Sequence, residues 1–100
     1  MRKRIRYAGH LEVRLDLRSI PRQLPRRIYH RAKELFFDNL TGNFVAVARA
    51  RYAGKIRDMM VAFSEKKDEI VLVTVHPLKP QQKANRVASG RWVRYEKGKE

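Results

Sequence analysis

Four apolar runs in the middle of the chain decide the fold: Glu34-Leu-Phe-Phe-Asp38, Asn43-Phe-Val-Ala-Val-Ala-Arg-Ala-Arg-Tyr52, Lys55-Ile-Arg-Asp-Met-Met-Val-Ala-Phe63 and Glu69-Ile-Val-Leu-Val-Thr-Val75. Each run is rich in β-branched or aromatic residues, as strands are. The segments between them, residues 39–42, 53–54 and 66–68, are short enough only for turns between antiparallel neighbours. The stretch therefore predicts a four-stranded meander. Its last two strands are apolar on both faces, so the sheet should be covered on one side and partly on the other.

Helical segments are expected on either side of this meander. From Leu24 to Leu35, apolar residues recur at helical spacing and basic residues occupy the remaining surface. Pro25 fits the first turn of such a helix, where its missing N–H costs nothing. After the meander, Gln81 to Ser89 form a second helical stretch that Gly90 ends. Residues 91–95 follow as a short strand or an extended arm.

The segment His10–Arg18 allows two interpretations. Its leucines and valine alternate strictly with polar residues, which on its own favours a half-buried strand. As a helix, the same segment places His10, Arg14 and Arg18 in one row, because residues four apart share a helix face. The three side chains share an orientation in either case.

The net charge of +14 lies in the two flanks of the meander. Residues 1–33 carry eleven Lys and Arg against two acids, residues 76–94 carry five against none, and residues 34–75 carry six of each. Fifteen of the 24 basic residues are Arg, whose guanidinium matches the geometry of a phosphate. A neutral scaffold with cationic flanks indicates a polyanionic partner, and a solvated basic surface is the alternative.

The composition limits the protein to a single domain over residues 1–100, with residues 96–100 as a flexible tail. One hundred residues, 43% of them hydrophobic, provide one modest core. With no Cys and no His or carboxylate cluster at ligand spacing, we expect no metal and no cofactor. No apolar segment approaches the length of a membrane span, so we expect a soluble, cytoplasmic protein.

Spaced motifs across residues 5–95 resemble a known family. They are His10-x-x-x-Arg14-Leu-x-x-Arg18-x-Ile20-Pro21, Phe37-Asp38-x-x-Thr41-Gly42-x-x-Val45-Ala46-Val47, Met60-Val61, Thr74-x-His76-Pro77 and Asn85-Arg86-x-x-x-Gly90-Arg91-Trp92. Together they resemble a little-characterised family of small prokaryotic proteins, which is similar in turn to the RelE/ParE-like toxins of toxin–antitoxin systems. The C-terminal catalytic motif of the best-studied RelE-type enzymes is not matched.

This resemblance implies an α+β fold and an activity. The fold is an N-terminal helical pair packed on the antiparallel four-stranded meander, with a short C-terminal helix and arm, so residues 10–18 become a helix. The activity is metal-independent cleavage of RNA, including ribosome-associated mRNA, held in check by an acidic antitoxin protein.

His76 is the first candidate for proton transfer. Metal-free cleavage of a phosphodiester needs a base for the 2′-hydroxyl proton, cations for the phosphorane oxygens and an acid for the leaving oxygen. His76 ends the last predicted strand on the face of Ile70, Leu72 and Thr74, and Pro77 fixes the chain direction after it. A histidine that only caps the sheet edge is the alternative.

Arginines from both flanks complete the candidate catalytic set. Arg86 and Arg91 follow His76 closely enough to turn back toward it and bind phosphate. His10 and Arg14 form a second group. Solvated surface residues are the alternative for each.

Further basic and aromatic side chains are assigned to RNA binding. They are Arg18, Arg26, Arg27, His30, Arg31, Lys33, Lys79, Lys83, Trp92, Tyr29 and Tyr95. The basic ones would contact the nucleic-acid backbone, and the aromatic ones would stack on unpaired bases unless they pack in the core. The basic residues 26–33 equally fit an acidic antitoxin.

Three function classes compete on this evidence. The first is a metal-independent endoribonuclease of the toxin–antitoxin type, the second a non-catalytic nucleic-acid-binding protein on the same scaffold, and the third a basic subunit that docks an acidic protein. RNA cleavage in EDTA separates the first from the others, and a steep salt dependence of RNA binding separates the second from the third.

Overall fold

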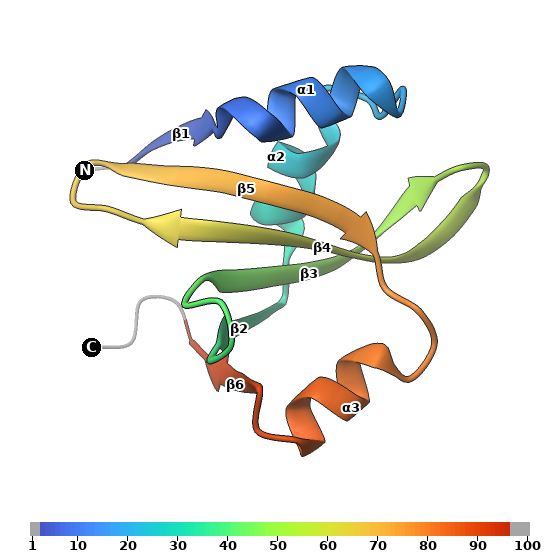
Figure 1. Cartoon of the computed structure of the whole chain (residues 1–100). Coiled ribbons are helices and arrows are strands. Elements are labelled where there is room, and N and C mark those ends of the chain that lie inside the picture. The colour runs from blue at the N-terminus through green and yellow to red at the C-terminus, as the bar shows by residue number, and fades with distance from the viewer. Residues whose placement is uncertain (1–2, 97–100) are drawn as a thin grey trace.

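A computed structural model describes residues 3–96, which form an α+β fold (Figure 1). The elements in chain order are β1 (Arg4–Tyr7), α1 (Gly9–Leu17), α2 (Leu24–Arg31), β2 (Glu34–Asp38), β3 (Phe44–Tyr52), β4 (Lys55–Glu65), β5 (Glu69–Pro77), α3 (Gln82–Ala88) and β6 (Trp92–Tyr95). The strands form one sheet in the order β1-β5-β4-β3-β2-β6. β1 runs parallel to β5, and the other neighbouring pairs are antiparallel.

The predicted meander is present as β2 to β5. The tightest of its turns joins Tyr52 to Lys55, which are paired, through two residues with positive φ, Ala53 at 52° and Gly54 at 79°. Positive φ at both central positions is the requirement of a type I′ hairpin turn, whose twist matches that of the strands. Ala53 adopts this conformation at a cost, because only glycine does so freely.

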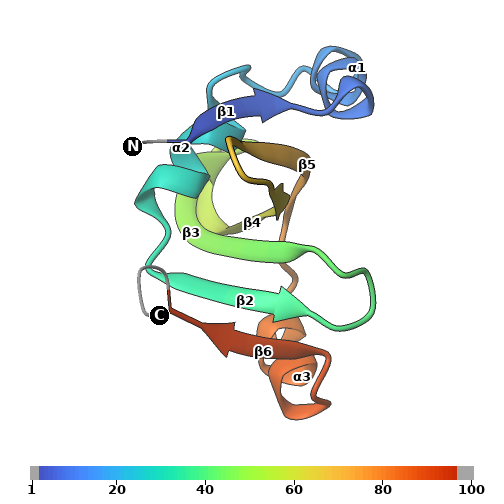
Figure 2. The same cartoon turned by 90° about the vertical axis from the view of Figure 1, so that its left-hand side faces the viewer.

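Apolar side chains cover both faces of the central strands, as predicted. On one face, Val61 of β4 and Leu72 of β5 are fully buried beneath Leu15 of α1 and Ile28 of α2. On the other face, a second cluster consists of Phe36, Val45, Val47, Met60, Ala62 and Trp92. Figure 2 shows α1 at the end of the sheet near β1 and β5, and α3 at the end near β6. The face of the second cluster is called the open face below, because α2 packs on the opposite face of the central strands. α1 and α3 lie at the two ends of the sheet that border it (Figure 2).

The segment His10–Arg18 forms a helix, α1, as the family resemblance implied. Leu11 and Leu15 are each 1% exposed, whereas Val13 and Leu17 are 57% and 78% exposed. The alternation of apolar and polar residues therefore does not predict which of the apolar side chains are buried. Only the leucines four residues apart face the core, and the remaining two point to solvent.

One of the predicted helix ends changes in the structure, and the other is confirmed. The helix from Leu24 ends at Arg31, one turn before Leu35, because Ala32 has extended backbone and Leu35 pairs with Ala46 in the sheet. The C-terminal helix ends as predicted, where Gly90 has a φ of 83° and its N–H donates to the carbonyl oxygen of Val87 at 3.1 Å.

The sheet has six strands within residues 3–96 rather than the predicted four. Residues 92–95 form a strand, β6, which pairs with β2, and this settles the choice between strand and arm. β1 was not predicted; it extends the other edge by pairing residues 4–7 with residues 69–72. Of the predicted tail, Glu96 is exposed, and residues 97–100 lie outside the described residues.

None of the helices in this part of the chain is long and apolar enough to cross a membrane. Across the same residues, no group of three or more His, Asp or Glu side chains is placed to hold a metal ion.

Candidate nucleic-acid interface

His76 lies on the open face of the sheet. An extra residue, Val73, interrupts the pairing of β5 with β4. Ile70 and Leu72, before this bulge, belong to the core beneath α1 and α2, whereas His76, after it, pairs with Met60 of the second cluster. The prediction that His76 shares a face with Ile70 and Leu72 is therefore wrong, because the bulge shifts the alternation of side chains by one residue.

The ring of His76 is oriented by the backbone of the next residue, Pro77. Nδ1 lies 3.2 Å from the carbonyl oxygen of Pro77, and the side chain is half-buried. In a neutral imidazole, a proton on Nδ1 would be donated to this oxygen and would leave Nε2 as an acceptor. This arrangement suits a general base.

The basic row of α1, formed by His10, Arg14 and Arg18, is exposed. Their side chains make no hydrogen bond or ion pair with any residue between 3 and 96. The acids of α1 lie elsewhere: Glu12 and Asp16 stand two residues from this row, which is about 200° around the helix, and Glu12 is paired with Arg22. The row is therefore free to bind an anion.

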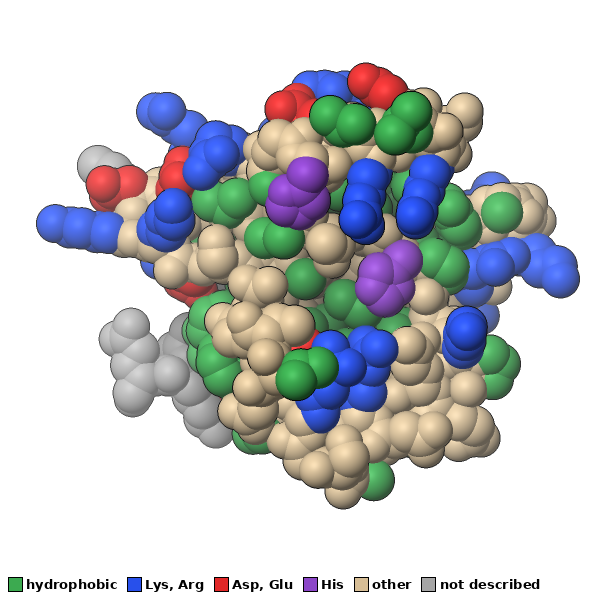
Figure 3. Space-filling view, viewed as in Figure 1, with side chains coloured by type: hydrophobic (Ala, Val, Ile, Leu, Met, Phe, Trp, Pro, Cys, Tyr) green, Lys and Arg blue, Asp and Glu red, His purple; other side chains and the backbone are tan. Residues whose placement is uncertain are grey.

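Figure 3 shows histidine, lysine and arginine side chains gathered on the face that the sheet turns to the viewer. Two histidine side chains lie on the face toward the viewer, one below α1 and the other over the end of β5, with Lys or Arg side chains beside them. Of the three histidines in the sequence, His10 belongs to α1, His76 to β5 and His30 to α2. A further group of Lys and Arg side chains lies lower on the same face, toward α3.

Arg91 is engaged within the protein by Asp38. Its Nε and Nη2 donate to Oδ1 and Oδ2 of Asp38, both at 3.0 Å, and the N–H of Leu40 donates to Oδ1 at 2.9 Å. Burial of Asp38 raises its carboxyl pKa, but these hydrogen bonds outweigh burial and hold the pKa below its ordinary value. The guanidinium of Arg91, predicted as a phosphate ligand, thus ties β2 to the start of β6.

Arg86 stacks on Trp92 and has no carboxylate partner among residues 3–96. Its Cζ lies 5.1 Å from the centroid of the Trp92 ring, which is also 5.2 Å from that of Phe36. Burial and, after it, the charge of Arg91 lower the pKa of Arg86, while the charge of Asp38 raises it and offsets part of this effect. Arg86 remains the best-placed phosphate ligand on the α3 side of the open face.

The predicted stacking residues are largely occupied by the core. Trp92 is 1% exposed and Tyr29 8% exposed, which is the core packing weighed as the alternative to stacking on bases. Tyr95 is half-buried, with its ring 4.9 Å from that of Phe44.

The other predicted basic residues divide between surfaces. Arg26, Arg27, His30 and Arg31 are exposed on α2, which covers the opposite face of the sheet from His76, so the structure does not bring them together with it. Lys79 is exposed beyond β5. Lys83 of α3 is ion-paired with Glu34 at 2.7 Å.

Two carboxylates that organise the site, Asp38 and Glu34, were given no role from the sequence. Glu34 accepts from Lys83 and, at 3.2 Å, from Arg94, and the hydrogen bond from Lys83 is the largest influence that lowers its pKa. The sequence did contain a signal for this role, because Glu34 and Asp38 begin and end one predicted strand. In a chain with so many cations, acids at these positions are expected to form ion pairs.

No family model matches the sequence, and no curated protein and no solved structure matches it. What this surface does must therefore be inferred from its own residues.

Proposed function

We propose that the protein is an RNA-directed, toxin-like protein of the RelE/ParE type that cleaves RNA without a metal ion. The observation that carries the proposal is that the bulge in β5 turns His76 to the open face of the sheet, the face on which Arg86 of α3 stacks on Trp92. The motifs that resemble this family lie on the same elements and support it further.

The proposed chemistry uses groups on this face alone. Nε2 of His76 takes the proton of a ribose 2′-hydroxyl, whose oxygen attacks the adjacent phosphorus. Arg14 and Arg86 bind the phosphate oxygens and stabilise the charge that develops on them. As the bond to the 5′-oxygen breaks, His10 donates a proton to that oxygen. The products are a 2′,3′-cyclic phosphate and a 5′-hydroxyl end.

A non-catalytic RNA-binding protein is the second candidate function. Two predicted site residues serve the fold, Arg91 through Asp38 and Trp92 through burial, and this favours binding over catalysis. A subunit that docks an acidic protein on its basic surface is the third candidate, and a steep salt dependence of RNA binding would favour the second candidate over it.

Cleavage of a long RNA in EDTA tests the proposal. We expect His76→Ala to slow cleavage by about 10²- to 10⁴-fold, because a positioned acid or base contributes that much. The control is Lys55→Ala, since Lys55 is exposed at the β3–β4 turn and belongs to neither RNA surface, and it should cleave like the wild type. Thermal melts of both variants should match the wild type.

Cleavage that persists in His76→Ala would refute the assignment of this base. If the wild type leaves RNA intact with and without ribosomes, the binding-protein function replaces the proposed one.

A further inference from the structure

A second basic surface lies on the α2 side of the sheet. Arg27, Arg31 and Lys33 are exposed there, and their side chains make no ion pair with any residue that the structure describes. α2 contains no acid. Arg27 and Arg31 are four residues apart, which places them about 6 Å apart along the helix axis. Arg31 and Lys33 also border a hollow whose other lining residues include Val47 and Lys83 of the open face and the acids Glu34 and Asp58, so this surface adjoins the open face at that hollow.

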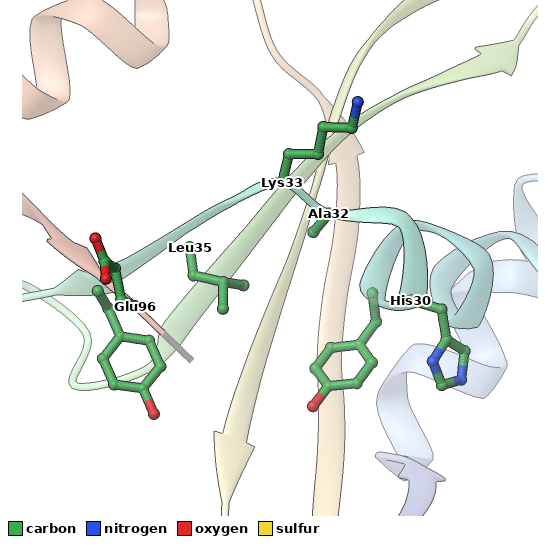
Figure 4. A pocket seen from close by; sticks show the side chains of 7 residues that line it. His30, Ala32, Lys33, Leu35 and Glu96 are labelled. Atoms are coloured by element: carbon green, nitrogen blue, oxygen red, sulfur yellow. The ribbon is translucent and has the colours of Figure 1, made fainter. Parts of the chain in front are cut away.

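A cavity opens beside this surface, where α2 ends (Figure 4). It measures about 340 Å³ and is lined by Tyr29, His30, Ala32, Lys33, Leu35, Tyr95 and Glu96. Figure 4 shows the side chain of Leu35 between two tyrosine rings, while the ammonium of Lys33 extends from the rim away from them. The volume lies in the range of small-ligand sites.

The lining of this cavity suits a nucleobase. The side chain of Leu35, the half-buried ring of Tyr95 and the small exposed part of Tyr29 offer apolar contact to a flat heterocycle. Cations beside a base-sized cavity are where the phosphates attached to that base would lie.

We propose that the α2 surface is a second RNA site, in which one unpaired base enters the cavity against Leu35 and the accessible part of Tyr95 while Lys33 and Arg31 hold the adjoining phosphates. A free nucleotide shares this chemistry. However, the cations continue from the cavity along α2 to Arg27, and this length of positive surface fits several phosphates of a strand rather than one. The site requires no cleavage and therefore goes beyond the proposed function.

The test uses a five-nucleotide single-stranded RNA with 2-aminopurine at its centre. The protein is the full chain with His76→Ala, so that binding is measured independently of cleavage. Arg31→Gln with Lys33→Gln should weaken binding about tenfold or more at low salt. The matched control, Arg51→Gln with Lys55→Gln, removes the same charge from exposed residues at the β3–β4 turn and should change affinity by less than about twofold.

A second variant tests the cavity without changing the charge. Ala32→Leu, with its melting temperature checked, should abolish the change in 2-aminopurine fluorescence and leave the salt dependence of binding unchanged. An equal loss of affinity in both charge variants would overturn the proposal, because it would show a general attraction. If the fluorescence change persists in Ala32→Leu, the base does not bind in the cavity, and the proposal is wrong. If adenosine monophosphate binds with the same affinity as the pentanucleotide, the ligand of this site is a free nucleotide and the RNA proposal is wrong.

Discussion

Asp38 is the buried charged residue of the described chain, with 4% of its surface exposed. Its oxygens accept three hydrogen bonds, two of them from Arg91. Such a carboxylate is retained only where its partners compensate for the loss of hydration, so β2, the following turn and β6 are held together at this residue.

Asp38→Asn should therefore lower the free energy of unfolding by about 1–3 kcal/mol, because it leaves the guanidinium of Arg91 without its counter-charge. The matched control is Asp58→Asn. Asp58 also pairs with an arginine, Arg49, but both side chains are exposed and such pairs contribute about 0–1 kcal/mol. Urea denaturation of the three proteins measures the difference, and equal losses in both variants would show that burial does not matter.

The same ion pair should make stability depend on pH. The pKa of Asp38 is lowered in the folded protein, so its ionised form stabilises the fold above the ordinary carboxyl pKa of about 3.9. That stabilisation is lost as the pH falls through the lower, folded-state pKa. The difference in unfolding free energy between wild type and Asp38→Asn should be constant from about pH 5 to 7 and should shrink below about pH 4. A difference that does not shrink at all as the pH falls from about 5 to about 2 would assign the effect to packing.

Single residues mark the limit of what the sequence could predict. The position of His76 at the end of a strand followed from its neighbours, but its face depended on the bulge at Val73, which no local pattern announces. Arg91 looked like a free phosphate ligand because its partner, Asp38, is 53 residues away in the chain. The free basic row of α1 was predictable, since four-residue spacing is local.

Among the elements, β4 is the centre of the core, with Val61 wholly buried between neighbouring strands. Val61→Asp should unfold the domain, because an unpaired buried carboxylate costs several kcal/mol, comparable to the total stability of a small domain. Ile56→Asp is the control on the same strand, where the side chain is 57% exposed, and it should fold. Circular dichroism melts distinguish them, and a wild-type melt in Val61→Asp would contradict this location of the core.

Local sequence was informative for elements with local causes. The strands β2 to β5 were predictable because their turns are short and their composition is distinctive. β1 was not, because a four-residue strand of alternating Arg and apolar residues forms only by pairing with residues 65 positions later. α1 was ambiguous because its exposed Val13 and Leu17 imitate the alternation of a strand.

At the scale of the whole molecule, the charge of +14 should govern association with nucleic acid. If RNA binding involves about four to six phosphate contacts, the logarithm of the affinity should fall with that of the salt concentration with a slope of about −3 to −5. Filter binding between low and moderate salt measures it. A flat profile would contradict both proposed RNA sites at once.

The strand order β1-β5-β4-β3-β2-β6 also constrains the sequence of events during synthesis. β1 and α1 leave the ribosome first, yet β1 has no partner strand until β5 has been made, so Leu11 and Leu15 stay without their core in the meantime. On the other side, β2 pairs with β3 early, but its outer edge has no partner until β6 has been made. The sheet therefore cannot be completed in the order in which its strands are synthesised. Its two outer strands should join a preformed β2–β5 meander, and pairings this distant make the last steps of folding slow.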